Sequence, residues 1–206
     1  MVDKKIEDLP ALSSVTGTIL IEVVDDDGNS RKVPLSDLKT FINTDPTVVP
    51  SSNPFRGALV KRTTSQAITT ATETPVTWES AVYDSDSIWS AGSPTRLTVP
   101  SGVTKVRLKA NVQWDISSVG FRYVAMKKNG ADFDGRGASL IDSLASNYEW
   151  QNIGSAVVAV TAGDYFDLRV QHSKGSNLNL LPSATSGSQT WSDLLWFSME
   201  VVEATP

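Results

Sequence analysis

The single histidine of the 206-residue chain, His172, is the residue that comes nearest to a catalytic group. A serine, this histidine and a carboxylate from Asp142 or Asp167 could form a hydrolytic triad, in which the histidine activates the serine hydroxyl group. The sequence contains no nucleophile-elbow motif, however, and no pattern places a serine beside His172. We therefore expect a hydrogen-bonded or exposed histidine and a protein without enzymatic activity.

Acidic pairs in predicted turns are the candidates for a metal site. Asp84 with Asp86, and Asp132 with Asp134, could supply the oxygen ligands that calcium prefers. No complete EF-hand pattern surrounds them, and Asp25–Asp27 is a further acidic turn. The chain contains no cysteine, which excludes disulfide bonds and thiolate metal sites. We expect solvated carboxylates and no cofactor.

Aromatic side chains beside predicted loops could bind a ligand. A flat apolar ring next to a few polar groups is typical of a sugar-binding site, although tryptophan and tyrosine are also ordinary core and interface residues. The stretch Ser173–Gln189 is rich in Ser, Asn and Gly and is expected to run over the surface as a loop. The loop-flanking aromatic residues are Trp89, Tyr148, Trp150 and Trp191. The candidate ligand-binding residues are Trp150, Asn177, Asn179 and Trp191.

Charge divides the chain into two parts. The net charge is −5, and the first 45 residues hold nine acidic and five basic residues, whereas the remainder is nearly balanced. Binding of nucleic acid needs a basic surface, so it is not expected. No apolar run reaches membrane-spanning length, and no apolar signal core follows Met1, so we expect neither membrane insertion nor export by an ordinary signal peptide. The predicted parts are a module (1–45), a proline-rich linker (46–56) and a larger domain (57–206).

The larger domain is predicted to be an antiparallel β-sandwich. Apolar side chains from Val106 through Val112 and Trp114 to Ile116 alternate with polar ones, which is typical of a strand with one buried face. Many short strands separated by turn residues favour a jelly roll. The expected strands are 57–63, 66–70, 75–79, 81–84, 95–99, 104–116, 121–128, 150–160, 165–172 and 193–203.

The N-terminal module is predicted to be a small α+β anchor. Strands are expected at 18–24 and 30–34, followed by a short helix from Ser36 to Ile42. Such a module has few apolar residues to bury by itself, so we expect it to pack against a partner. The candidate anchor residues are Ile6, Leu9, Leu35, Leu38 and Phe41.

The last predicted strand has apolar residues on both faces at its start. Leu195, Phe197 and Met199 alternate on one face, while Leu194 and Trp196 lie on the other. The core can cover only one of these faces. A second copy of the chain is a natural cover for the other, so Leu194 and Trp196 are candidate subunit-interface residues.

Residues 57–203 resemble the C1q/TNF-like jelly-roll superfamily, in the form found in bacteriophage structural proteins. The resemblance implies a compact homotrimer that binds other molecules and performs no chemistry; the collagen-like stalk of the family is missing here. Residues 4–42 resemble the N-terminal attachment segment of phage head or tail fibres. The residues that carry these resemblances are Ala81–Asp86, Pro94–Gly102, the strand through Trp114, Lys128–Gly130, Ala162–Leu168 and Trp196–Glu200 in the larger domain, and Lys4–Pro10 and Lys32–Leu38 in the module.

Together these features predict a virion protein, made in the host cytoplasm and placed on the virion surface. Residues 1–45 would attach to phage capsid or tail proteins, and a trimeric head fibre or decoration domain would be displayed, with a host-surface glycan or protein as its possible ligand. Tail fibre, receptor-binding protein and tail carbohydrate-active enzyme are the alternatives, and a secreted ligand-like trimer is disfavoured by the expected lack of a signal peptide. The sequence leaves head or tail location open.

Overall fold

The computed structural model describes residues 20–24, 30–34, 55–143 and 148–205, and the chain divides into two compact units, Met1–Asn53 and Pro54–Pro206. In the first unit, β1 (Leu20–Val24) pairs antiparallel with β2 (Ser30–Pro34). Both strands lie where the sequence predicts them. The predicted helix from Ser36 to Ile42, and the anchor residues Ile6, Leu9, Leu35, Leu38 and Phe41, lie outside the described residues.

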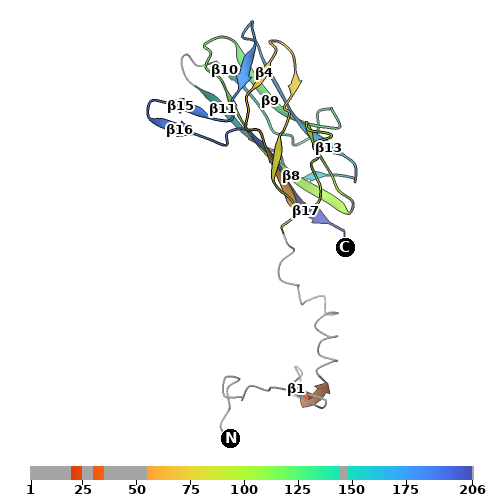
Figure 1. Cartoon of the computed structure of the whole chain (residues 1–206). Coiled ribbons are helices and arrows are strands. Elements are labelled where there is room, and N and C mark those ends of the chain that lie inside the picture. The colour runs from red at the N-terminus through yellow and green to blue at the C-terminus, as the bar shows by residue number, and fades with distance from the viewer. Residues whose placement is uncertain (1–19, 25–29, 35–54, 144–147, 206) are drawn as a thin grey trace. The chain divides into compact units, whose positions relative to one another are not determined.

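The second unit is a sandwich of two antiparallel sheets (Figure 1). The larger, eight-stranded sheet has the order β4-β14-β8-β17-β3-β6, with β11 and β12 also paired to β8, and the smaller has the order β10-β9-β13-β5, with β7 paired to β13. The bounds in the larger sheet are β3 Gly57–Lys61, β4 Gln66–Ile68, β6 Ser80–Asp84, β8 Val103–Trp114, β11 Glu149–Gly154, β12 Val158–Ala159, β14 Leu178–Leu180 and β17 Trp196–Ala204. Those in the smaller are β5 Thr74–Pro75, β7 Arg96–Thr98, β9 Phe121–Lys128, β10 Ala138–Asp142 and β13 Tyr165–His172.

The order of the strands makes this sandwich a jelly roll. From β4 to β9 each successive strand lies in the other sheet, and the chain changes sheet again between β10 and β11, between β12 and β13, and between β13 and β14. The last strand, β17, lies between β3 and β8, so the end of the domain is hydrogen-bonded to its beginning. The predicted fold class, a mainly β protein with an antiparallel jelly-roll domain, is confirmed.

The alternating pattern of β8 places its apolar side chains in the core. Val106, Leu108, Ala110, Val112 and Trp114 are all fully buried, as predicted. Ile116 is 44% exposed, so its assignment to the buried face is wrong. The strand ends at Trp114, and the chain then turns away from the ladder.

The stretch Ser173–Gln189 is not the surface loop that the sequence predicts. It contains β14, whose Leu178 and Leu180 are buried and which pairs with β4 and β8. It also contains β15 (Ala184–Ser186), which pairs with β16 (Gln189–Trp191) in a hairpin that projects from the sandwich in Figure 1. The run Leu178-Asn179-Leu180 alternates as a strand does, but three residues are too few to stand out in a polar stretch.

Two other expectations about strands are wrong. β10 lies where no strand was predicted, and the single strand expected at 150–160 is divided into β11 and β12. Ser155, between the two, bonds to main-chain groups: its N–H donates to Leu108 O and its hydroxyl accepts from Leu108 N. The ladder is interrupted at this point, so the edge of the larger sheet is formed by two short strands.

Candidate binding surfaces

His172 is a fully buried residue whose two ring nitrogens both bind the main chain. Nε2 lies 2.9 Å from the carbonyl oxygen of Ile68, so it carries the proton and donates, and Nδ1 accepts from the N–H of Lys174 at 3.2 Å. The ring meets the indole of Trp114 edge-on at 5.8 Å. These partners fix a neutral tautomer, and the prediction of a hydrogen-bonded histidine is confirmed.

Burial and the nearby positive charges favour the same neutral form of His172. Burial lowers its pKa below the ordinary value of 6.5, the hydrogen bond to Ile68 raises it, and the positive charges of Arg122 and Lys174 lower it further. The two candidate orienting carboxylates lie elsewhere: Asp167 binds Arg169 at 2.7 Å, and Asp142 is exposed on β10. The described geometry therefore gives His172 a structural role.

A buried ion pair between Arg122 and Glu149, next to His172, was not predicted. Arg122 Nε lies 3.4 Å from Glu149 Oε2, and both side chains are almost completely buried. The guanidinium also donates to the carbonyl oxygens of Ser117, Val119 and Phe121 at 3.0–3.1 Å. Burial lowers the pKa of Arg122, and the charge of Glu149 raises it. Glu149 occupies an inward-facing position of β11, a place where the alternating pattern alone predicts an apolar residue.

The acidic pairs considered as calcium ligands are engaged by the protein itself. Asp84 accepts the N–H groups of Ile88 and Trp89 at 2.8 and 2.9 Å. Asp86 binds Arg56 through two oxygens, and this hydrogen-bonded pair holds its pKa below the ordinary value. For Asp84 and Asp86 the expectation of solvated carboxylates is therefore wrong.

The second acidic pair also meets basic side chains. Asp132 contacts Lys127 Nζ at 2.7 Å and forms an ion pair with Arg136. Its partner in sequence, Asp134, is exposed. Within the described ranges, no group of three His, Cys, Asp or Glu side chains could hold a metal ion.

Two of the candidate ligand-binding residues lie together. Trp150 on β11 and Trp191 at the end of β16 have ring centroids 6.5 Å apart, with planes inclined by 56°. Both are substantially exposed, at 56% and 37%. Asn177 and Asn179 belong to a different region: Asn177 is exposed, and Asn179 pairs with Ala67 of β4. The fold thus separates the four candidates into two pairs.

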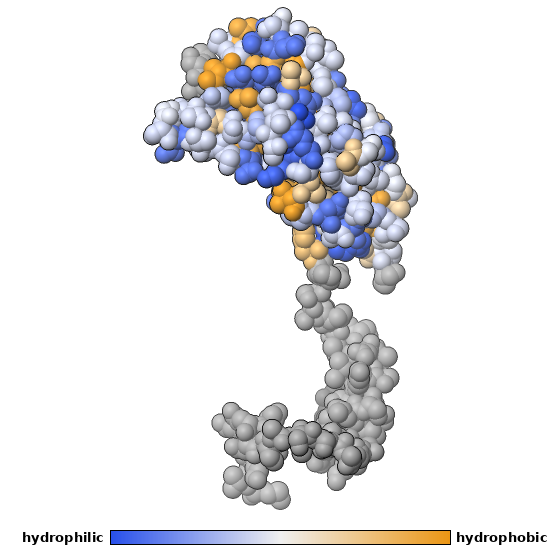
Figure 2. All heavy atoms as spheres, viewed as in Figure 1, coloured by the Kyte–Doolittle hydropathy of each residue, from blue (hydrophilic) through white to orange (hydrophobic). Residues whose placement is uncertain are grey.

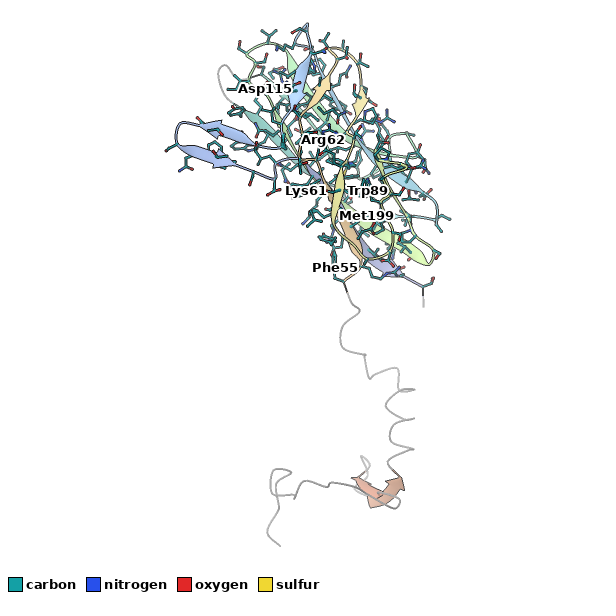
Figure 3. The ribbon with its side chains drawn as sticks, viewed as in Figure 1. Phe55, Lys61, Arg62, Trp89, Asp115 and Met199 are labelled. Atoms are coloured by element: carbon teal, nitrogen blue, oxygen red, sulfur yellow. The ribbon has the colours of Figure 1, made fainter. Side chains whose placement is uncertain are left out.

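The two faces of the last strand differ as the sequence predicts. Phe197 and Met199 are fully buried, whereas Trp196, on the outer face, is only half-buried. Trp196 lies in register with Asn111 of β8 and Lys61 of β3, and Figure 3 labels Lys61 on this sheet. The role of Leu194 and Trp196 in an interface stays a prediction.

Comparison with known proteins adds the following. No family model and no curated protein matches the sequence. Among solved structures, Eiger TNF from S. frugiperda is 14% identical, with a TM-score of 0.44, over 75% of this chain and 96% of that one. Murine APRIL at pH 8.0 is also 14% identical, with a TM-score of 0.45, over 72% of this chain and all of that one. Because these sequence identities and TM-scores are low, the jelly-roll assignment rests on the strand order described above.

The described segments contain no helix with the length and apolar character needed to span a membrane.

Proposed function

We propose that this chain is a non-enzymatic structural protein of a bacteriophage particle, which forms a homotrimer and displays its jelly-roll domain on the virion surface. The observation that carries the proposal is the outer face of β17. Trp196, and Leu194 just before the strand, are only partly buried, while the opposite face of the same strand is already in the core. Large apolar side chains left in water at the middle of a sheet face are typical of a subunit contact.

A second exposed apolar surface lies on the smaller sheet. Leu140 on the edge strand β10 is 63% exposed, and Ile116 and Val119, in the connection that leads into β9, are also exposed. An edge strand with an exposed leucine and unpaired main-chain groups is prone to association unless it is covered. Contact between this surface and the β17 face of the next copy would join two different patches. Such contacts close into a ring when the rotation between copies allows it, and the resemblance of residues 57–203 to C1q/TNF-like domains suggests a ring of three.

The place on the virion and the absence of catalysis are supported by separate features. Residues 4–42 resemble phage fibre attachment segments, and the excess of acidic residues before residue 46 distinguishes this part from the jelly-roll domain. The main-chain hydrogen bonds of His172 leave neither ring nitrogen available to activate a nucleophile. Location on the head or the tail, and attachment to capsid or tail proteins through residues 1–45, would be resolved by a cryo-EM map of the particle.

Light scattering on the purified full-length chain tests the oligomer. A mass near three times the chain mass of 22.2 kDa is expected at micromolar concentration. Trp196→Asp should shift the mass toward the monomer, because it places an unpaired charge in the contact. Val157→Asp, at an exposed position between β11 and β12 and outside both proposed contact patches, is the control and should retain the trimer. A monomeric wild type would contradict the proposal.

A further inference from the structure

The tryptophan pair, Trp150 with Trp191, forms an open aromatic surface on the larger sheet. The two rings come from β11 and from the projecting hairpin, and their 56° inclination leaves a wedge between them instead of a stacked contact. With 56% of Trp150 and 37% of Trp191 exposed, much of this aromatic area faces water. Such an arrangement leaves room for a flat, partly apolar ligand between or across the rings.

Amide side chains lie on the same face of the sheet as Trp150. In the ladder between β11 and β8, Trp150 lies opposite Gln113, and Asn152 lies opposite Asn111. All four side chains are on the outer face, because the residues alternating with them, such as Val112 and Ile153, are in the core. Amide groups can both donate and accept hydrogen bonds, which suits a ligand with several hydroxyl groups.

Gln113 has an unsatisfied oxygen next to the pair. Its side chain is fully buried, and its Nε2 donates to the carbonyl oxygen of Trp114 at 3.0 Å. Its Oε1 is buried and, within the described structure, has no hydrogen-bond partner. A buried acceptor without a donor costs free energy, and its neighbour across the ladder, Trp150, is 56% exposed. A ligand hydroxyl seated beside Trp150 could supply the missing donor.

The hairpin carries hydroxyl and amide groups but little apolar area. From residue 185 to 192 the sequence is Thr-Ser-Gly-Ser-Gln-Thr-Trp-Ser, and all eight residues are exposed. Figure 2 shows the projecting arm in pale colours, without the orange of strongly apolar residues. An arm that packs on a second copy would be expected to bury aliphatic side chains, and this one has none to bury. It also carries no charged residue, so the chemistry fits a neutral ligand.

We propose that Trp150 and Trp191 form a binding site for a neutral hexopyranose unit of a glycan. The indole rings take the apolar C–H face of the sugar, and the amides of Asn152 and Gln113 bind its hydroxyl groups. The inference deepens the adhesive part of the proposed function and rests on it for the biological role. Binding itself requires neither a trimer nor a virion.

The test uses the full-length chain titrated with maltohexaose, cellohexaose and hexa-N-acetylchitohexaose, with hexagalacturonate as the acidic comparison, and binding is followed by calorimetry and tryptophan emission. At least one neutral hexaose should bind, and hexagalacturonate should not. Trp150→Ala and Trp191→Ala should each weaken binding at least tenfold, while Trp191→Phe should retain part of it.

Phe55→Ala is the matched control for loss of an exposed ring. Phe55 is 58% exposed, and its ring centroid lies 5.3 Å from that of Tyr83. Its neighbours are the charged side chains of Arg56 and Asp86, whereas amides lie beside the tryptophan pair. This variant should bind the hexaose as the wild type does. Every variant is first checked for wild-type mass by light scattering.

Three results would overturn the proposal: no neutral hexaose binds, Trp150→Ala binds as tightly as the wild type, or Trp191→Ala changes the oligomer mass, which would make the pair a subunit contact. A monomeric wild type that still binds a hexaose through Trp150 would contradict the trimer and leave the sugar site standing.

Discussion

At the scale of single residues, two of the polar side chains that the sequence singles out bind the protein's own main chain. His172 bonds to Ile68, which is remote in sequence, and Asp84 closes a local turn through Ile88 and Trp89. The residue types were visible in the sequence. Their partners were not, because every residue has a carbonyl group. Only the completed fold determines which carbonyl group lies beside a given side chain.

His172 predicts a fall in stability at mildly acidic pH. Its pKa is below 6.5 in the folded chain. As the pH falls below 6.5, the unfolded chain therefore binds more protons than the folded chain does. The free energy of unfolding decreases as the pH falls. Above that range both states are neutral and the group has no effect. Urea unfolding at pH 7.5, 6.5 and 5.5 should show a loss of up to about 1.4 kcal/mol per pH unit, the limit for one proton.

The matched variant for this measurement is His172→Gln, which retains a side-chain donor toward Ile68. It should be less stable than the wild type at pH 7.5 but should show a much flatter pH dependence between 7.5 and 5.5. No second histidine in the chain titrates in this window. An unchanged slope in the variant would exclude His172 as the source.

Glu79 predicts a second loss of stability, at more acidic pH. Its carboxylate accepts hydrogen bonds from the main-chain N–H and hydroxyl groups of Thr63 and Thr64. Burial raises its pKa, but these bonds and the charge of Arg62 outweigh that effect and lower it from 4.5 to about 2. The stabilisation is complete above pH 4.5 and is lost as the pH falls toward 2.

Glu79→Gln should therefore lower the free energy of unfolding at pH 7 by about 1 kcal/mol, a value reduced for solvent screening of this partly exposed group. Its stability should also fall less than that of the wild type between pH 5 and 3. Glu73→Gln, which alters a glutamate 3.4 Å from Lys127, is the control and should behave like the wild type. Equal behaviour of the two variants would contradict the assigned role of Glu79.

At the scale of the elements, long alternating strands were predictable and short ones were not. The sequence of β8 alternates from Lys105 to Trp114, and Phe197 and Met199 of β17 face the core as expected. β14 has three residues, and its identity depends on pairing with β4 and β8, not on its own pattern. Arg122 on β9 and Glu149 on β11 occupy inward positions where the alternating pattern predicts apolar side chains. The ion pair that they form fills this space instead.

The register of β8 predicts opposite outcomes for neighbouring residues. Leu108 is fully buried, so Leu108→Ala should lower the free energy of unfolding by about 2–5 kcal/mol, the range for loss of a buried leucine with a cavity left behind. Lys109 is exposed, and Lys109→Ala should change it by less than about 0.5 kcal/mol. Chemical denaturation of both variants at pH 7 measures this. Equal effects would refute the register.

At the scale of the whole molecule, the candidate surfaces arise from connections that sequence reasoning cannot follow. Trp150 and Trp191 were both recognised as loop-flanking aromatic residues, but only the pairing of β11 with β8 and the return of the β15–β16 hairpin bring them within 6.5 Å. Asn177 and Asn179 were grouped with them by composition alone. β14 instead carries Asn179 to the ladder with β4, because burial of Leu178 and Leu180 determines where that strand lies.

The division into two units predicts that attachment and folding of the head are separable. The unit from Pro54 to Pro206 contains both sheets, and the buried apolar residues of the sandwich come from its own strands and connections. Deletion of residues 1–45 should leave the trimeric state and the melting temperature nearly unchanged, because no core residue of the sandwich is removed. The same deletion should abolish incorporation into particles, since the proposed attachment segment is lost.

The comparison is best made between the deletion and a full-length Leu38→Asp variant, both supplied to particles that lack the wild-type protein. Light scattering, a thermal melt and immunodetection on purified particles give the three readouts. Leu38→Asp replaces one predicted anchor residue by a charge, so it should retain mass and melting temperature while reducing incorporation. If the deleted chain still decorates particles, attachment resides in the jelly-roll domain. If its melting temperature falls by many degrees, residues 1–45 are part of the folded head, and the proposed separation of attachment from folding is wrong.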